Sequence, residues 1–147
     1  MLMVSLPILS ACEREVTGAE AEAVLIWSEP TVDRIFIGLS SGNYEVFSSD
    51  FDSYMQASIP YSCFADWRSG IEDELGEYLS RGVHRVTQQD EFYVVEYLAS
   101  FEYQKSTSIG VAFHKSDHSI SHISIEVADF RSAPEPRREC ELVTGGA

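Results

Sequence analysis

Residues 42–76 decide the fold, and they read GNYEVFSSDFDSYMQASIPYSCFADWRSGIEDELG. The second half of this stretch predicts the longest amphipathic helix of the chain, which begins at Pro60 and ends at Gly76. Its apolar side chains recur at helical spacing and form one face: Phe64, Trp67, Ile71 and Leu75. This stretch therefore predicts a helical layer whose apolar face packs against another layer of the domain.

Two short helical turns are expected before that helix. Ser41 or Asn43 can accept hydrogen bonds from the free N–H groups at the start of the first turn, over residues 44–47. Ser49 or Asp50 is the expected cap of the second turn.

The region before residue 42 predicts two helices. Residues 17–20 have the spacing of a capping box, which starts the first helix. Pro30 is expected to interrupt it after Trp27, and Ser28 to cap a second helix. The second helix has a buried face formed by Val32, Ile35, Phe36 and Leu39.

After Glu77 the apolar period changes from about 3.6 to about 2 residues, which indicates β-strands. The predicted strands span residues 78–87, 92–103, 109–113 and 123–127. Gly82 is expected to mark a bulge in the first strand. Keeping the apolar residues on one face predicts Tyr103 opposite Ile109, and Phe113 opposite Ile123.

Helices followed by a meander of strands predict an α+β domain, in which N-terminal helices pack on a curved antiparallel sheet. We divide the chain into residues 1–11, a remnant of a lipoprotein signal, and residues 12–28, a tether with a short helix. Residues 29–131 form the α+β domain, and residues 132–147 form a disordered tail.

Several packing residues carry a resemblance to a known family. They are Gly42-Asn43-Tyr44, Phe47-Ser48, Phe51-Asp52, Met55, Ile59-Pro60, Phe64, Ile71, Leu75-Gly76, Phe92-Tyr93-Val94-Val95 and Tyr97. In these positions the chain resembles prokaryotic secreted and lipoprotein domains of unknown function with a nuclear transport factor 2-like (cystatin-like) fold. The resemblance implies a cone-shaped domain and no catalytic residues. Relatives of this fold that are enzymes, such as ketosteroid isomerase-like and dehydratase-like proteins, place catalysis in a pocket between sheet and helices.

The charge of the chain excludes one class of partner. It has 10 Lys and Arg residues against 24 Asp and Glu residues, a formal net charge of −14 at pH 7. Nucleic-acid binding depends on basic surfaces that release counterions from phosphates. We therefore exclude nucleic acid as a partner.

The N-terminal segment predicts the cellular compartment. An apolar run over residues 1–9 leads into Leu9-Ser10-Ala11-Cys12, which resembles a bacterial lipobox, whose cysteine becomes the lipidated N-terminus. The run is too short to cross a bilayer. No Lys or Arg precedes Cys12, so either the true start lies upstream of Met1 or the resemblance is accidental and the run is a buried strand. We expect an extracytoplasmic lipoprotein that is anchored to the membrane through Cys12.

The remaining cysteines are Cys63 and Cys140. In an oxidising compartment these two thiols can form a disulfide.

A metal site is not expected. The predicted register sets His114 opposite His122, a geometry that suits two metal ligands. A third ligand is missing, because Glu126 lies about 13 Å from His122 by strand rise. We interpret these histidines as solvated side chains, and no cofactor motif occurs in the sequence.

Carboxylates and tyrosines offer a candidate pocket: Asp52, Asp66, Tyr93, Tyr97 and Tyr103. A carboxylate beside a tyrosine inside the cone would support acid–base chemistry. The competing interpretation is that the tyrosines are core residues and the aspartates are helix caps, and we favour it.

Small residues on the outer face of the predicted sheet form a candidate contact surface: Ser100, Gly110, Ala112 and Ser124. Small side chains permit close approach of a second sheet, so a homodimer through this face is one expectation. The other expectation is that this face of the sheet is simply exposed to solvent.

The function expected from the sequence is a membrane-anchored extracytoplasmic lipoprotein, a non-enzymatic module that binds a small molecule or a protein. The alternative is a small cone enzyme, isomerase-like or dehydratase-like, which uses a pocket carboxylate and a tyrosine. The patterns identify an architecture rather than a reaction.

Overall fold

The computed structural model describes residues 13–126 and 128–131. The expected signal remnant, the lipidation site Cys12 and the expected tail over residues 132–147 lie outside the described residues.

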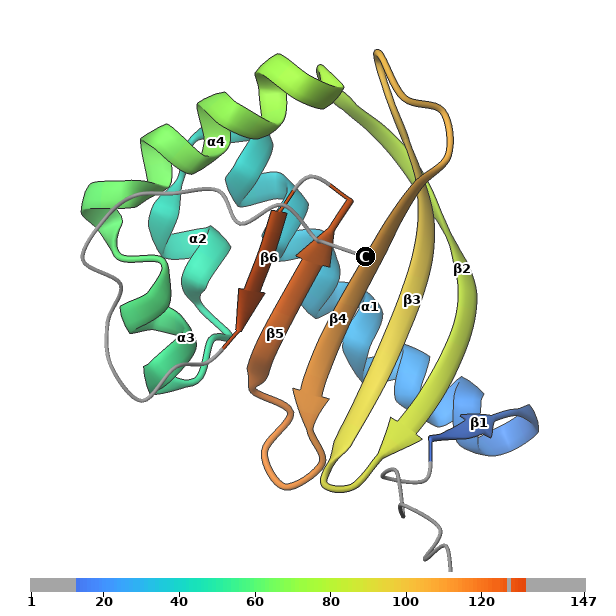
Figure 1. The fold of residues 1–147 in the computed structure, drawn as a ribbon. Helices are drawn as coiled ribbons and strands as arrows, with labels where there is room; N and C mark the ends of the chain where they lie inside the picture. Colours follow the sequence, from blue (N-terminus) through green and yellow to red (C-terminus); the bar gives the residue numbers. More distant parts are fainter. Residues whose placement is uncertain (1–12, 127, 132–147) are drawn as a thin grey trace, which may run out of the picture.

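Strands and helices follow the order β1 (Arg14–Val16), α1 (Gly18–Ser41), α2 (Tyr44–Ser48), α3 (Ser53–Ser58), α4 (Tyr61–Leu75), β2 (Tyr78–Gln89), β3 (Phe92–Phe101), β4 (Thr107–His114), β5 (Ile120–Ile125) and β6 (Ala128–Arg131). The strands form one six-stranded antiparallel sheet in the order β1-β2-β3-β4-β5-β6. The predicted α+β architecture is confirmed. Figure 1 shows α1 crossing behind the curved sheet, α2 and α3 beyond β6, and α4 leading across the top of the view to β2. Part of the expected tether forms β1 and the first turns of α1.

One apolar core lies between the helices and the sheet. The predicted face of α4 is confirmed, because Phe64, Trp67, Ile71 and Leu75 are all buried. Alternate residues of β3 face the same core: Val95, Tyr97, Ala99 and Phe101. The helical layer therefore covers one face of the sheet.

α1 is one continuous helix of 24 residues, so the predicted break at Pro30 is wrong. A proline inside a helix costs roughly 3 kcal/mol. Val24 and Val32, on either side of Pro30, are both buried in the core, so burial of one continuous helix face offsets this cost. Ser28 is buried inside α1 rather than capping a helix, and Thr17 makes no capping hydrogen bond through its side chain.

Side chains cap both short helices. The cap of α2 is one of the predicted residues, and the cap of α3 is not. Asn43 Oδ1 accepts a hydrogen bond from Val46 N at 3.2 Å, so one of the two predicted caps of α2 is correct. Asp52, rather than Ser49 or Asp50, caps α3.

The register between β3 and β4 differs from the prediction. Tyr97, not Tyr103, lies opposite Ile109. The β3–β4 ladder ends at the pair Ala99 and Thr107. β3 itself ends at Phe101, and Tyr103 N donates a hydrogen bond to Leu75 O at the end of α4, at 2.8 Å. The displacement is an even number of residues, so every side chain keeps its predicted face.

The later strands also shift. Ile123 lies opposite Val111 rather than Phe113, and an irregularity between Ala112 and Phe113 changes the register of the β4–β5 pair. Gly82 itself stays in the ladder, and the irregularities of β2 fall on either side of it.

Two glycines are required by close contacts. A Cβ atom on Gly38 of α1 would lie 2.4 Å from Phe47 N, so α1 and α2 can pack this closely only at a glycine. Gly76 ends α4 with a φ of +76°, and a Cβ atom there would lie 2.6 Å from Glu102 Cβ. Gly76 thus lets the helical layer turn into the sheet.

We expect Gly76→Ala to lower the free energy of unfolding by about 2 kcal/mol, because it adds both a clash and an unfavourable φ. Gly82→Ala is the matched control, since no atom beyond its two chain neighbours lies within 4 Å of the added Cβ. It should change stability by less than about 0.5 kcal/mol. Urea unfolding of both variants tests this, and equal effects would contradict the account.

Candidate functional site

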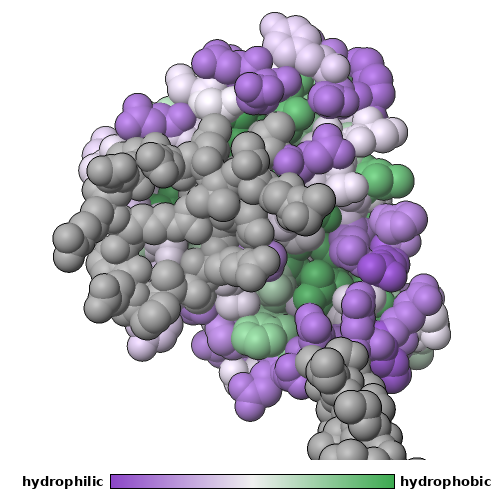
Figure 2. Space-filling view, viewed as in Figure 1, coloured by the Kyte–Doolittle hydropathy of each residue, from purple (hydrophilic) through white to green (hydrophobic). Residues whose placement is uncertain are grey.

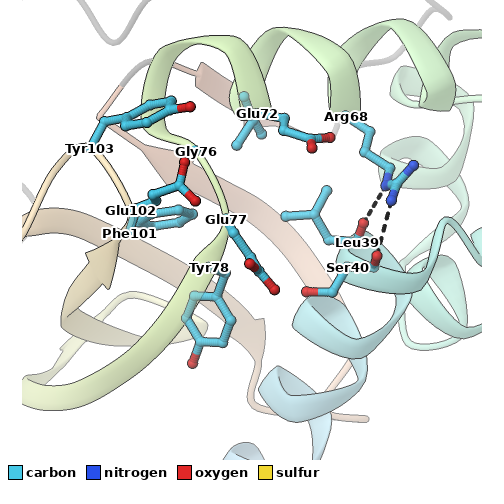
Figure 3. Close-up of a pocket in the computed structure, with 11 residues that line it drawn as sticks. Leu39, Ser40, Arg68, Glu72, Gly76, Glu77, Tyr78, Phe101, Glu102 and Tyr103 are labelled. Atoms are coloured by element: carbon cyan, nitrogen blue, oxygen red, sulfur yellow. Dashed lines mark hydrogen bonds between the residues drawn. The ribbon is translucent and has the colours of Figure 1, made fainter.

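A cavity of about 250 Å³ lies where α1 and α4 end, β2 begins and β3 ends. Figure 3 shows side chains from all four of these segments converging on it. The cavity exists because Gly76 turns the chain here and because the hairpin after β3 folds back onto the end of α4.

Three carboxylates line the cavity: Glu72 of α4, Glu77 before β2, and Glu102 after β3. None of them forms a salt bridge with a cation of the described residues. A hydrogen bond to Glu102 and the charge of that carboxylate raise the pKa of Tyr103, and Glu72 adds to the effect. The cavity is therefore a region of negative potential.

Arg68 is the one cation that lines the cavity among the described residues, and it is already bound. Its Nε donates a hydrogen bond to Leu39 O at 2.5 Å, and its Nη2 donates to Ser40 O at 2.9 Å (Figure 3). These carbonyl groups end α1, where a cation is favourable. Arg68 thus stabilises the end of α1 and does not pair with the carboxylates.

Aromatic side chains supply the apolar part of the lining. Phe101 is buried, and Tyr78 stacks on Phe36 with ring centroids 4.1 Å apart. Tyr103 stands at the rim, with 65% of its surface exposed. The lining of the cavity therefore contains both aromatic side chains and carboxylates.

A partly buried ion cluster adjoins this wall, and the sequence analysis missed it. Arg81 Nη2 lies 2.7 Å from Asp33 Oδ1 and 3.3 Å from Glu29 Oε2, and its Nη1 donates to Tyr78 Oη at 3.2 Å. Tyr97 Oη donates to Glu29 Oε1 at 2.5 Å. These residues form the Arg81 cluster, which fixes Tyr78 beside the cavity.

Burial and hydrogen bonding compete in the Arg81 cluster. Burial by itself would lower the pKa of Arg81, but hydrogen bonds to Asp33 and Tyr78 outweigh it and raise the pKa. Burial and the bond to Glu29 raise the pKa of Tyr97. The sequence contains one indication of this cluster: Glu29 and Asp33 lie one helical turn apart, on the same face of a continuous helix. The predicted break at Pro30 hides it, because it places the two carboxylates on either side of the break.

The predicted carboxylates do not meet at the cavity. Asp52 Oδ1 accepts a hydrogen bond from Met55 N at 2.6 Å, and its Oδ2 lies 2.9 Å from His114 Nε2. Asp66 is exposed on α4. Asp52 therefore joins α3 to the sheet, and Asp66 contacts solvent.

The predicted tyrosines are also dispersed. Tyr93 Oη donates to Glu20 at 3.4 Å, near the start of α1, and Tyr97 belongs to the Arg81 cluster. Of the five candidate pocket residues, Tyr103 alone lines the cavity.

The predicted pairing of the two histidines is wrong. His122 lies opposite Ala112, while His114 lies opposite Phe92 and contacts Asp52. Among residues 13–126 and 128–131, no group of three or more metal-ligating side chains comes together.

The outer face of the sheet carries a second hollow of about 400 Å³. Gly110 and Ser124 lie opposite each other and line it, Ala112 follows on the same face, and Ser100 lies farther along β3. An ion pair between Arg85 and Glu96 crosses this face. Figure 2 shows polar side chains around a smaller hydrophobic area there.

No family model, no curated protein and no solved structure matches this chain. In the described part of the chain, no helix combines the length and the apolar character needed to cross a bilayer.

The first cavity is suited to hold an organic cation. Three carboxylates can neutralise an ammonium or guanidinium group, and the aromatic rings can contact the apolar part of the same ligand. An anion would meet repulsion.

We expect the stability of the protein to fall as pH rises above about 10, the ordinary pKa of tyrosine. In the native state Tyr97 keeps its proton, because its pKa is raised, whereas the unfolded state releases it. The unfolded state then binds fewer protons, so the free energy of unfolding decreases with pH. Tyr97→Phe should flatten this decrease by up to about 1.4 kcal/mol per pH unit. Equal slopes for the two proteins in urea unfolding would contradict the assignment.

Proposed function

We propose that this protein is a non-enzymatic binding module, and that its cavity takes a small ligand with an amine or guanidinium group joined to an apolar or aromatic body. One observation carries the proposal. Glu72, Glu77 and Glu102 line a single cavity, while the lining cation Arg68 is committed to the end of α1.

The energetics favour a cation that also has apolar surface. Charge pairs at an exposed site contribute up to about 1 kcal/mol each, so carboxylates by themselves give weak binding. Rings at the wall add cation–π attraction of about 0.5–2 kcal/mol and apolar burial. A ligand that uses both parts of the cavity is therefore preferred over a simple inorganic cation.

The alternative, an isomerase-like or dehydratase-like enzyme, has less support. Tyr103 and Glu102 are a tyrosine and a carboxylate in contact at the cavity, but the pKa of Tyr103 is raised. A general base works best with a pKa near the working pH, which this phenol does not have. The pair is better suited to binding than to proton transfer.

We expect phenethylamine to bind and phenylacetate, which has the opposite charge on a similar body, not to bind. Glu72→Gln and Glu77→Gln should each weaken phenethylamine binding about fivefold, because each removes about 1 kcal/mol of attraction. Asp66→Asn is the matched control, since Asp66 is exposed on the same helix outside the cavity. Isothermal titration calorimetry tests this. Tighter binding of phenylacetate, or an equal effect of all three substitutions, would refute it.

We also propose that the module is extracytoplasmic and lipid-anchored through Cys12. Cys63 of α4 is disulfide-bonded. Disulfides persist in oxidising compartments, which supports export. The sequence has three cysteines. If Cys12 carries the lipid, the disulfide partner of Cys63 within this chain is Cys140.

Metabolic labelling with radioactive palmitate tests the anchor. Cys12→Ala should abolish labelling and release the protein from membranes, because it removes the acylated thiol. Cys140→Ala should keep the label. An unlabelled native protein would rule out this anchor.

A further inference from the structure

One edge of the sheet is only partly covered. β1 pairs with β2 through Val86, Thr87 and Gln88. On the side away from β3, no strand of the described chain pairs with residues 78–85, the first part of β2. Figure 1 shows this part of β2 along the open edge of the sheet, above β1. Every second residue of such an edge turns its N–H and C=O groups outward, where another strand can bind them.

Unpaired charges, which usually protect an edge strand, are missing here. Arg81 is held by Asp33, with 2.7 Å between Nη2 and Oδ1. Arg85 pairs with Glu96 and with Glu13. The two cations of this edge are therefore neutralised by the protein itself.

The edge also offers apolar side chains, and it includes a short run of regular register. Leu79 and Val83 are 53% and 42% exposed. The register of β2 against β3 is regular from Ser80 to Val83, with an irregularity on either side. An added strand would therefore pair over this short run.

The cavity lies at the beginning of the same edge. Tyr78 is the first residue of β2 and lines the cavity, and Glu77 precedes it. Figure 3 shows both residues on the stretch of chain that enters β2. A strand paired to the edge would end beside the three carboxylates.

We propose that residues 80–83 of β2 accept an extended segment of a partner polypeptide as an added strand, with a lysine or arginine side chain of that segment in the cavity. This inference rests on the proposed function of the cavity as a cation site. Backbone pairing supplies affinity and the cavity selects the side chain, as in other cases of strand addition.

Charge decides between this partner and a second copy of the chain. Each copy has a formal net charge of −14, so two copies repel each other. A basic segment is attracted to the same surface and gains from the three carboxylates. The occupant is therefore a basic segment of a different protein.

The test uses a short fluorescent peptide of alternating threonine and valine that ends in lysine, titrated against the full chain by fluorescence anisotropy. Two further peptides carry N-methyl groups on alternate residues, one on the odd set and one on the even set. Strand addition uses every second N–H of the peptide, so one set should weaken binding more than about tenfold and the other should not. Replacing lysine by norleucine should weaken binding about fivefold, and Glu77→Gln should then add little, because both changes remove the same contact.

Three results would overturn the inference: equal binding of both methylated peptides, no binding of any peptide, and a dimer that light scattering detects and Val83→Lys dissociates. Phenethylamine is titrated in parallel. If it binds while the peptides fail, the cation site stands and the edge inference is wrong. If it also fails, the proposed function is wrong as well.

Discussion

The turn at Gly76 is the constraint on which the rest of the structure depends. At this residue the helical layer passes into the sheet with a φ of +76°, which favours glycine. A Cβ atom there would also lie 2.6 Å from Glu102 Cβ, so there is no room for a side chain. Tyr103 N and Glu102 N donate to Leu75 O and Glu77 O, so the hairpin after β3 is bound to the end of α4. These contacts follow the end of the β3–β4 ladder at Ala99 and Thr107, and they hold Glu102 and Tyr103 at the cavity.

The arrangement of charges follows from that turn. It gathers Glu72, Glu77 and Glu102 although like charges repel, a local cost that binding sites commonly carry. Arg68 lines the same cavity and its charge relieves part of this cost, but its donors bind carbonyl groups of α1 rather than the carboxylates. Arg81 is bound to Asp33 and Glu29. Three carboxylates against one guanidinium leave the lining with a net negative charge, which is the physical reason to expect a cation there.

The parts of the fold that depend on local spacing could be predicted from the sequence. The buried face of α4 follows from its apolar period, and the faces of β3 follow from strict alternation. Asn43 was one of two capping candidates for α2 because its side chain accepts from the helix start. These features need only neighbouring residues.

The features set by contacts distant in sequence could not be predicted. α1 continues through Pro30 because both of its halves pack on one sheet, which the local penalty of a proline does not reveal. The β3–β4 ladder ends at Ala99 and Thr107, and Tyr103 beyond it binds Leu75 of α4. Of the candidate pocket residues, Tyr103 alone lies at the cavity. The carboxylates of the cavity could not be predicted, because they come from three segments that only the turn at Gly76 brings together.

The central claim is that the cavity beside Gly76 binds an organic cation. The most direct measurement is a titration of the isotopically labelled protein with phenethylamine, followed by the NMR shifts of its backbone amides. The account predicts that the shifts concentrate at Gly76, Glu77, Tyr78, Glu102 and Tyr103, which line the cavity. Shifts centred on Gly110 and Ser124 of the outer face, or no shifts at all, would contradict it.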